Sequence, residues 1–358
     1  MWQLGSLGLA SFATCAVMIL LARNIYQLTG SNENLSAVQA AHHRPTARVG
    51  GVGIFIAVVL SSAFAPDVVA SDYLHFLLAT SFLFFVGLGE DLGVGIAPVK
   101  RLLAAFFASL MVIVLLDVWL PRSNVPGLDP WLEYWWVGVP ITLIITAGIA
   151  NGFNLIDGVN GLAAITAMIA SIAMASIAYQ AEYYAMVTLN SMLTVIILGF
   201  FVLNFPFGKI FLGDAGAYTI GFILSWFGIA MILNTSDVTT WAMLLIMFWP
   251  VMDTCLAIYR RLRRTHRATA PDRLHVHQLI MRFLEIYLLG RGRRHIANPL
   301  STLLLTPFIA LPACIGVLLW DQPGVAFLAV VALTIFFFTA YVFAIPISRR
   351  LNRKRCCV

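Results

Sequence analysis

Long apolar stretches separated by short polar loops run along almost the whole chain. Each stretch has about 17–23 residues, which is the length that a helix needs to cross the hydrocarbon core of a bilayer. Pro, Gly and charged residues mark the ends of the stretches. The pattern predicts an all-α, polytopic integral membrane protein with eleven spans, near residues 2–22, 50–66, 73–89, 99–120, 133–150, 158–178, 183–203, 214–234, 238–258, 300–320 and 324–346.

The composition excludes a soluble enzyme. Hydrophobic residues make up 61% of the 358 residues and charged residues 11%, whereas soluble domains contain about 45–50% and about 25%. The first span has neither a basic segment before it nor a small-residue cleavage site after it, so we expect it to be retained. We therefore predict one transmembrane domain over residues 1–346, which includes a loop at 260–298, and a basic tail over 347–358.

The basic residues indicate an orientation. Alternate loops hold every one of the 22 Lys and Arg residues except Arg122. Cytoplasmic loops of membrane proteins carry an excess of Lys and Arg. We therefore expect the N-terminus on the periplasmic side of a bacterial inner membrane and the C-terminus in the cytoplasm. The expected cytoplasmic segments are 23–49, 90–101, 151–157, 204–213, 260–298 and 347–358.

Two acidic motifs lie at ends of predicted spans on that side. Glu90 and Asp91 are adjacent where the third span ends, and two neighbouring carboxylates bind divalent cations or accept protons. Asn154, Asp157 and Asn160 recur every three residues between the fifth and sixth spans, so they share a face if this segment enters a helix. The alternative interpretations are a solvated helix end for the first motif and a helix cap for the second.

A third motif opens the eighth span. Asp214 stands between Gly213 and Gly216, shortly after Lys209. One interpretation is an N-cap. The other is a magnesium ligand, because Mg²⁺ is held by one or two protein oxygens together with substrate phosphates, whose remaining charge Lys209 would neutralise.

The loop at 260–298 combines arginines with histidines. It includes Arg267, Arg273, His275 and His277. Alternating histidines project the same way from an extended segment, as zinc ligands sometimes do. A diphosphate is the preferred ligand, because the surrounding arginines attract an anion and repel a cation.

All four motifs face one side, which favours a single shared site at the cytoplasmic membrane surface. The competing class is a polytopic transporter or flippase of lipid-linked or anionic solutes. Transporters place charged residues near the bilayer midplane and often contain inverted repeats. Here the acids cluster near one surface, and the chain shows no repeat at a fixed offset.

The motifs resemble, in kind and order, those of the polyprenyl-phosphate N-acetylhexosamine-1-phosphate transferases, over nearly the whole chain. Their early Pro-Thr-Pro-Arg-x-Gly-Gly segment is similar to residues 45–51, which include Arg48 and follow His42. Their paired-Asp motif resembles Glu90-Asp91, and the later motifs resemble residues 154–158, 213–216 and 275–278.

The resemblance implies transfer of a sugar 1-phosphate from a UDP-N-acetylhexosamine to undecaprenyl phosphate, with release of UMP. Such a reaction would initiate O-antigen or other cell-envelope glycan synthesis. It implies Mg²⁺, or Mn²⁺ in its place, held by Asp214 and Asn154. The implied surroundings are a lipid bilayer, with no nucleic acid as a partner. The resemblance is compatible with a homodimer. The implied catalytic residues are Glu90, Asp91, Asp157 and Asp214, and the implied substrate-binding residues are Arg48, Asn154, Asn160, Lys209, Arg267, Arg273, His275 and His277.

Four positions depart from the pattern of the family. Glu90 replaces the first Asp of the pair, Asn160 replaces a later Asp, and Gln278 replaces the last His. Each replacement keeps the capacity to form hydrogen bonds. Val94 stands where the muramoyl-pentapeptide branch has a Lys, which favours the hexosamine branch.

Overall fold

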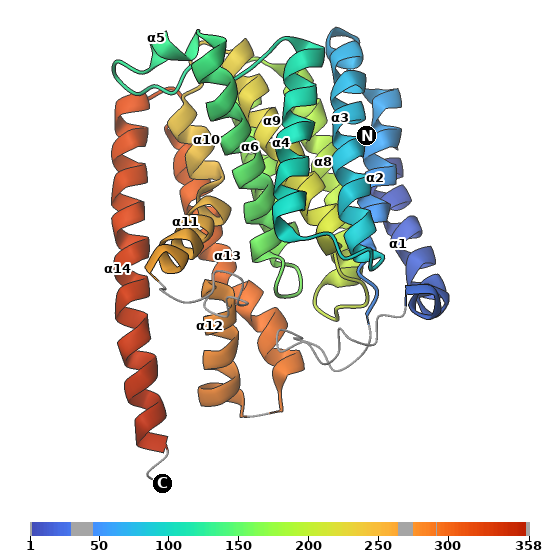
Figure 1. Cartoon of the computed structure of the whole chain (residues 1–358), viewed down its shortest axis with the longest axis vertical. Helices are drawn as coiled ribbons and strands as arrows, with labels where there is room; N and C mark the ends of the chain where they lie inside the picture. Colours follow the sequence, from blue (N-terminus) through green and yellow to red (C-terminus); the bar gives the residue numbers. More distant parts are fainter. Residues whose placement is uncertain (1, 30–45, 264–274, 291, 356–358) are drawn as a thin grey trace.

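A computed structural model describes residues 2–29, 46–263, 275–290 and 292–355. Within these ranges the chain forms helices and no strands (Figure 1). The helices are α1 (Trp2–Thr29), α2 (Gly50–Ser61), α3 (Ala70–Asp91), α4 (Pro98–Leu116), α5 (Asp129–Leu132), α6 (Trp135–Ile156), α7 (Leu162–Gln180), α8 (Tyr184–Asn204), α9 (Gly213–Asn234), α10 (Thr240–Ile246), α11 (Phe248–Arg263), α12 (Val276–Phe283), α13 (Arg294–Leu318) and α14 (Pro323–Arg355). Short 3₁₀ turns cover Ser62–Phe64 and Asp67–Val69, and a π-helical turn covers Leu284–Leu289.

The prediction of an all-α, multi-pass membrane protein is confirmed. Among the described residues, nine helices are long and apolar enough to cross a membrane, and a bent pair makes a tenth. Two of the eleven predicted spans are not single long helices in the described part of the chain. The segment predicted at 50–66 forms only the short apolar helix α2 and its 3₁₀ extension. The segment predicted at 238–258 is broken by an 80° bend between α10 and α11.

Helix α9 forms the centre of the bundle. It is buried over almost its whole length, as expected of a helix that is apolar on every side. Its neighbours include α2, α3, α6 and α7. Helix α14 lies at the edge, packs mainly against α10 and α13, and is mostly exposed, so its apolar surface faces lipid (Figure 1).

The two ends of the bundle differ in chemistry. At the end near α5, Arg122 donates to the carbonyl oxygens of Thr235 and Val238 at 2.6 and 2.8 Å. Asn124 accepts there from the backbone N–H of Thr240 at 2.8 Å. These contacts tie loops together through backbone groups. The opposite end, where α3 and α6 finish and α9 begins, holds the acidic motifs.

Candidate active site

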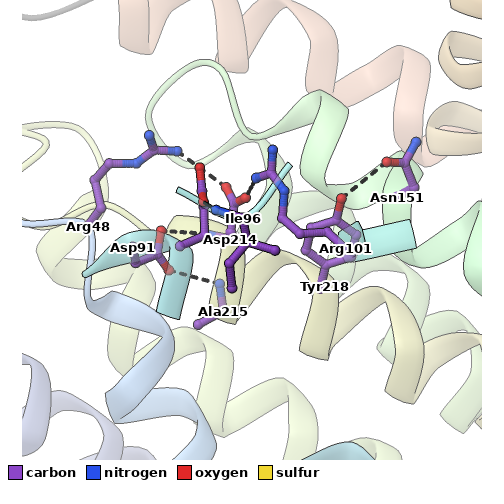
Figure 2. A network of polar contacts seen from close by, with 9 residues as sticks. Arg48, Asp91, Ile96, Arg101, Asn151, Asp214, Ala215 and Tyr218 are labelled. Carbon is purple, nitrogen blue, oxygen red and sulfur yellow. Dashed lines mark hydrogen bonds and ion pairs between the residues drawn. The ribbon is translucent and has the colours of Figure 1, made fainter. Parts of the chain in front are cut away.

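The first turn of α9 gathers carboxylates from two other helices. Asp91, the last residue of α3, accepts from the backbone N–H of Asp214 at 2.9 Å and from that of Ala215 at 2.8 Å (Figure 2). The N–H of Gly213 donates to the carboxylate of Asp157, which directly follows α6. The first N–H groups of a helix have no partner within the helix and carry a partial positive charge. They therefore attract both carboxylates to one place.

Gly213 permits this close approach. Its φ of +75° lies in the left-handed region, which side chains disfavour. A Cβ atom there would collide with the carbonyl oxygen of Arg48 and lie 2.5 Å from Oδ2 of Asp91. A glycine is therefore required where these segments meet.

Asp214 lies between two arginines. Its side chain is buried, with Oδ1 3.5 Å from Arg48 and Oδ2 ion-paired with Arg101 of α4 (Figure 2). The Arg48 side chain is 48% exposed and that of Arg101 is 16% exposed. Arg48 is therefore accessible from solvent, whereas Arg101 is enclosed with the carboxylate of Asp214.

Backbone pairing places Arg48 at the site. The N–H groups of Gly50 and Gly51 donate to Phe211 and Leu212 at 2.8 and 2.9 Å, and the N–H of Phe211 donates to Ala47 at 2.9 Å. Residues 47–51 are thereby fixed alongside the segment that precedes α9. Two motifs far apart in the sequence form one structural unit.

Asp157 has an altered proton affinity. Burial raises the pKa of its carboxyl group to about 6, although Arg48 and the Gly213 N–H act in the opposite direction. The group is therefore mainly ionised at neutral pH and becomes protonated in mildly acidic solution.

Glu90 acts on the loop between α3 and α4. Its carboxylate accepts from the backbone N–H of Ile96 at 2.5 Å. This contact fixes the segment from which α4 begins at Pro98. Since Arg101 lies in the first turn of α4, Glu90 helps to set the position of that arginine.

The three remaining polar residues proposed near these motifs have different surroundings. Asn154 has no side-chain hydrogen bond within the described residues. Asn160 is buried and donates to Pro206 at 2.9 Å, and its backbone N–H donates to Asn298 at 2.7 Å, so it joins this turn to α13. Lys209 is exposed, with its ammonium 5.9 Å from the centre of the Phe207 ring.

The histidines reach the site from α12. His275 lies directly before this helix and its Nδ1 is 2.7 Å from Oδ2 of Asp253 in α11. The ring of His277 stacks on that of His275 with centroids 5.7 Å apart. Gly158 contacts Nε2 of His277 so closely that a Cβ atom on this residue would collide with it.

His277 is uncharged at neutral pH. Burial lowers its pKa to about 4; the charge of Asp253 raises it and that of His275 lowers it further. Nε2 of His277 is buried and has no hydrogen-bond partner among the described residues. His277 is therefore suited to a hydrogen bond with a ligand rather than to charge pairing with a phosphate.

The side chains at the start of α9 fit a hard divalent cation. They offer carboxylate oxygens from Asp91, Asp157 and Asp214, and the buried Oδ2 atom of Asp214 is met there by the Arg101 guanidinium. Within the described residues, no three His, Cys, Asp or Glu side chains are arranged to hold a metal by themselves. Mg²⁺ normally completes its shell with waters and substrate phosphates.

Three residues of the sequence-based hypothesis, His42, Arg267 and Arg273, lie outside the described residues. Conversely, the sequence motifs do not include two residues of the site, Arg101 and Asp253. In the sequence, Arg101 is one of the basic residues that indicate topology. Asp253 lies inside a predicted span, and an ionisable residue within an apolar run is itself a signal of function.

Comparisons with known proteins identify the family of the chain. Residues 73–232 match the family described as Glycosyl transferase family 4. The chain is 31% identical over 261 residues to a probable undecaprenyl-phosphate N-acetylglucosaminyl 1-phosphate transferase of Bacillus subtilis, covering 70% of this chain and 72% of that protein.

Two further relatives carry related names. The undecaprenyl-phosphate alpha-N-acetylglucosaminyl 1-phosphate transferase of Yersinia pestis is 28% identical over 242 residues, or 65% of each chain. The decaprenyl-phosphate N-acetylglucosaminephosphotransferase of Mycobacterium tuberculosis is 26% identical over 269 residues, or 67% of this chain and 66% of its own. The resemblance seen in the sequence motifs is thereby confirmed, and the chain belongs to glycosyl transferase family 4.

Proposed function

We propose that this protein transfers an N-acetylhexosamine 1-phosphate from a UDP-sugar to undecaprenyl phosphate. A phosphate oxygen of the lipid attacks the β-phosphorus of the UDP-sugar. The bond between that phosphorus and the oxygen bridging to the α-phosphate breaks, and UMP leaves with the bonding electrons. The products are undecaprenyl-diphosphate-sugar, which keeps the β-phosphate of the donor, and UMP, which keeps the α-phosphate.

The observation that carries the proposal is the convergence of three carboxylates and two arginines on the first turn of α9. Asp91 ends α3, Asp157 directly follows α6 and Asp214 lies in the first turn of α9, where Arg48 and Arg101 flank it. Both reactants are polyanions, so the transfer requires positive charge and a cation to bring them together. The position of the cluster at one end of the bundle suits a lipid phosphate at the membrane surface, whereas a transport site would suit the midplane.

Asp214 and Asn154 would hold Mg²⁺, or Mn²⁺, which when bound neutralises phosphate oxygens and polarises the β-phosphorus. Arg48 and Arg101, now paired with Asp214, are placed to contact phosphate oxygens instead. Asp157 is ionised at neutral pH and adds an anionic oxygen. Asp91 fixes the first turn of α9 and thereby sets the position of Asp214.

The histidine segment supports binding of the nucleotide sugar. His277 lies against Gly158, at the end of the Asn154–Gly158 motif, and His275 stacks on His277. We assign His275 to the diphosphate and His277 to an uncharged hydrogen-bonding group of the donor. Lys209, Arg267 and Arg273 supply further positive charge along the same loops.

The site faces the cytoplasm in this proposal, with the N-terminus periplasmic and the C-terminus cytoplasmic. The distribution of 21 basic residues supports this orientation. It is tested by Ala270→Cys in a background without other reactive cysteines. An impermeant thiol reagent is expected to label this position only after cells are permeabilised, and labelling in intact cells would contradict the orientation.

The donor is tested with a panel of UDP-sugars and purified protein in detergent. We expect UMP release from a UDP-N-acetylhexosamine that requires both undecaprenyl phosphate and Mg²⁺, and its loss in Asp214→Asn. A lipid-linked N-acetylhexosamine diphosphate as the product would support a role of this protein in initiating O-antigen or other envelope glycan synthesis. Binding of a lipid-linked sugar without any UMP release would instead favour the transporter.

A further inference from the structure

Asp253 is a buried carboxylate outside the cluster at α9. It lies in α11 and is 1% exposed. Its Oδ2 atom is 2.7 Å from Nδ1 of His275, and its Oδ1 atom accepts from the backbone N–H of Val276 at 3.4 Å. One side chain of α11 therefore holds both the histidine and the first residue of α12.

The contact with Nδ1 determines which atom of His275 is left for a ligand. A carboxylate beside Nδ1 keeps a proton on that nitrogen and fixes the plane of the ring. Nε2 is then the ring nitrogen of His275 that remains for a ligand. Such outer partners orient histidines that ligate metals, where their loss costs about 10- to 100-fold in affinity or activity, and we expect a similar loss here.

The position of this pair connects it with the proposed active site. His277 stacks on His275, and its Nε2 atom is buried, lacks a partner in the described part of the chain and lies against Gly158. Gly158 follows Asp157 directly. Asp253 thus holds a segment that touches the turn carrying one of the three converging carboxylates.

Stability alone is a weak explanation for this arrangement. Removing two ionisable groups from water costs free energy that their attraction often only balances, so apolar residues of similar volume would serve a purely structural brace as well. The side chains are 1% and 6% exposed, so the cost applies to both. An orienting role explains why a carboxylate stands at this place.

We propose that Asp253 is a positioning residue for the transfer reaction, which holds His275 so that its Nε2 atom meets the diphosphate of the bound nucleotide sugar. The identity of that ligand rests on the proposed function. The orientation of the ring does not, because it is a property of the ligand-free protein.

The kinetic test is a double-mutant cycle of Asp253→Asn and His275→Ala in purified protein. Each single variant is expected to lower kcat/KM for UDP-N-acetylglucosamine by about 10- to 100-fold, and the double variant by no more than about twofold beyond the worse single one. Asp253→Glu, which keeps the charge, is expected to retain more activity than Asp253→Asn. Losses that multiply in the double variant would overturn the proposal.

The matched control is Tyr341→Phe. It removes the hydroxyl group that accepts from Arg260 at 3.3 Å, and thus perturbs another contact of α11 without touching His275. We expect kcat/KM to stay within about twofold of wild type. An equal loss in this variant would show that any disturbance of α11 lowers activity, and would overturn a specific role for Asp253.

A spectroscopic test separates this inference from the proposed function. In ligand-free protein labelled with ¹⁵N-histidine, the signals of His275 are identified by their absence in His275→Ala. We expect Nδ1 of His275 to be protonated in the wild-type protein. This measurement does not require that the Asp253→Asn variant folds. A ring with an unprotonated Nδ1 would overturn the inference. If Nδ1 is protonated but no UDP-sugar releases UMP, the proposed function fails and the orientation stands.

Discussion

Replacing Asp91 with Asn is expected to destabilise the protein as well as to inactivate it. Asp91 accepts two backbone N–H groups from the first turn of α9, one on each carboxylate oxygen. Asparagine has a single acceptor oxygen and presents an NH₂ group in place of the second. One N–H of α9 then loses its partner, and the helix terminus loses a favourable negative charge.

The magnitude follows from these two losses. A hydrogen bond to a charged group is worth about 1.5–3 kcal/mol, and a carboxylate at a helix N-terminus about 0.3–1 kcal/mol. Together they predict a loss of about 2–4 kcal/mol in the free energy of unfolding. For a chain of 358 residues we expect an apparent melting temperature lowered by about 3–5 °C.

The assay is thermal unfolding of the purified variant in detergent, followed by circular dichroism at one heating rate because such unfolding is often irreversible. Asp237→Asn is the control, since this carboxylate is exposed at the opposite end of the bundle. It should shift the unfolding free energy by less than about 0.5 kcal/mol. An inactive Asp91→Asn that melts like wild type would refute the capping role and return Asp91 to direct chemistry.

Three further predictions follow from the site. Asp214→Asn should keep less than about a tenth of the wild-type rate, a loss of at least about 1.4 kcal/mol in transition-state stabilisation, measured as UMP release from folded variant; a rate above that limit would remove Asp214 from the proposed metal ligands. Because burial raises the pKa of Asp157 to about 6, kcat/KM should fall as pH drops below about 6. Higher Mg²⁺ should move this limb to lower pH, since a cation held by Asp214 and Asn154 favours the ionised form of a neighbouring carboxylate. A flat profile from pH 5 to 8 would contradict the role of Asp157. Gly158→Ala should displace His277 and raise KM for UDP-sugar by about tenfold, and unchanged steady-state kinetics would show that this contact is dispensable.

Much of the fold could be predicted from hydropathy, because each crossing helix needs a long apolar run. Hydropathy is averaged over a window of residues and does not report the direction of the helix axis. It therefore did not show the 80° bend between α10 and α11. It also did not distinguish the short helix α2 from a full span. The backbone pairing of residues 47–51 with Phe211 and Leu212 explains why a segment this short is held inside the bundle.

The candidate site was predictable where its residues form local motifs. Asp91, Asp157 and Asp214 each stand in a recognisable cluster, and the structure brings all three to α9. Arg101 was missed because a basic residue at the start of a span is usually a topology signal. Asp253 was missed because its partner, His275, is 22 residues away in the sequence and meets it only through the fold.

The destination of the β-phosphate of the donor tests the central claim most directly. Purified protein is incubated with UDP-N-acetylglucosamine labelled with ³²P at the β-position, undecaprenyl phosphate and Mg²⁺, and the label is followed into the lipid phase, with Asp214→Asn as the inactive control. The proposed reaction predicts that the label enters the lipid together with the sugar, in amounts equal to the UMP released. Label retained in UDP while the sugar enters the lipid would contradict sugar-phosphate transfer.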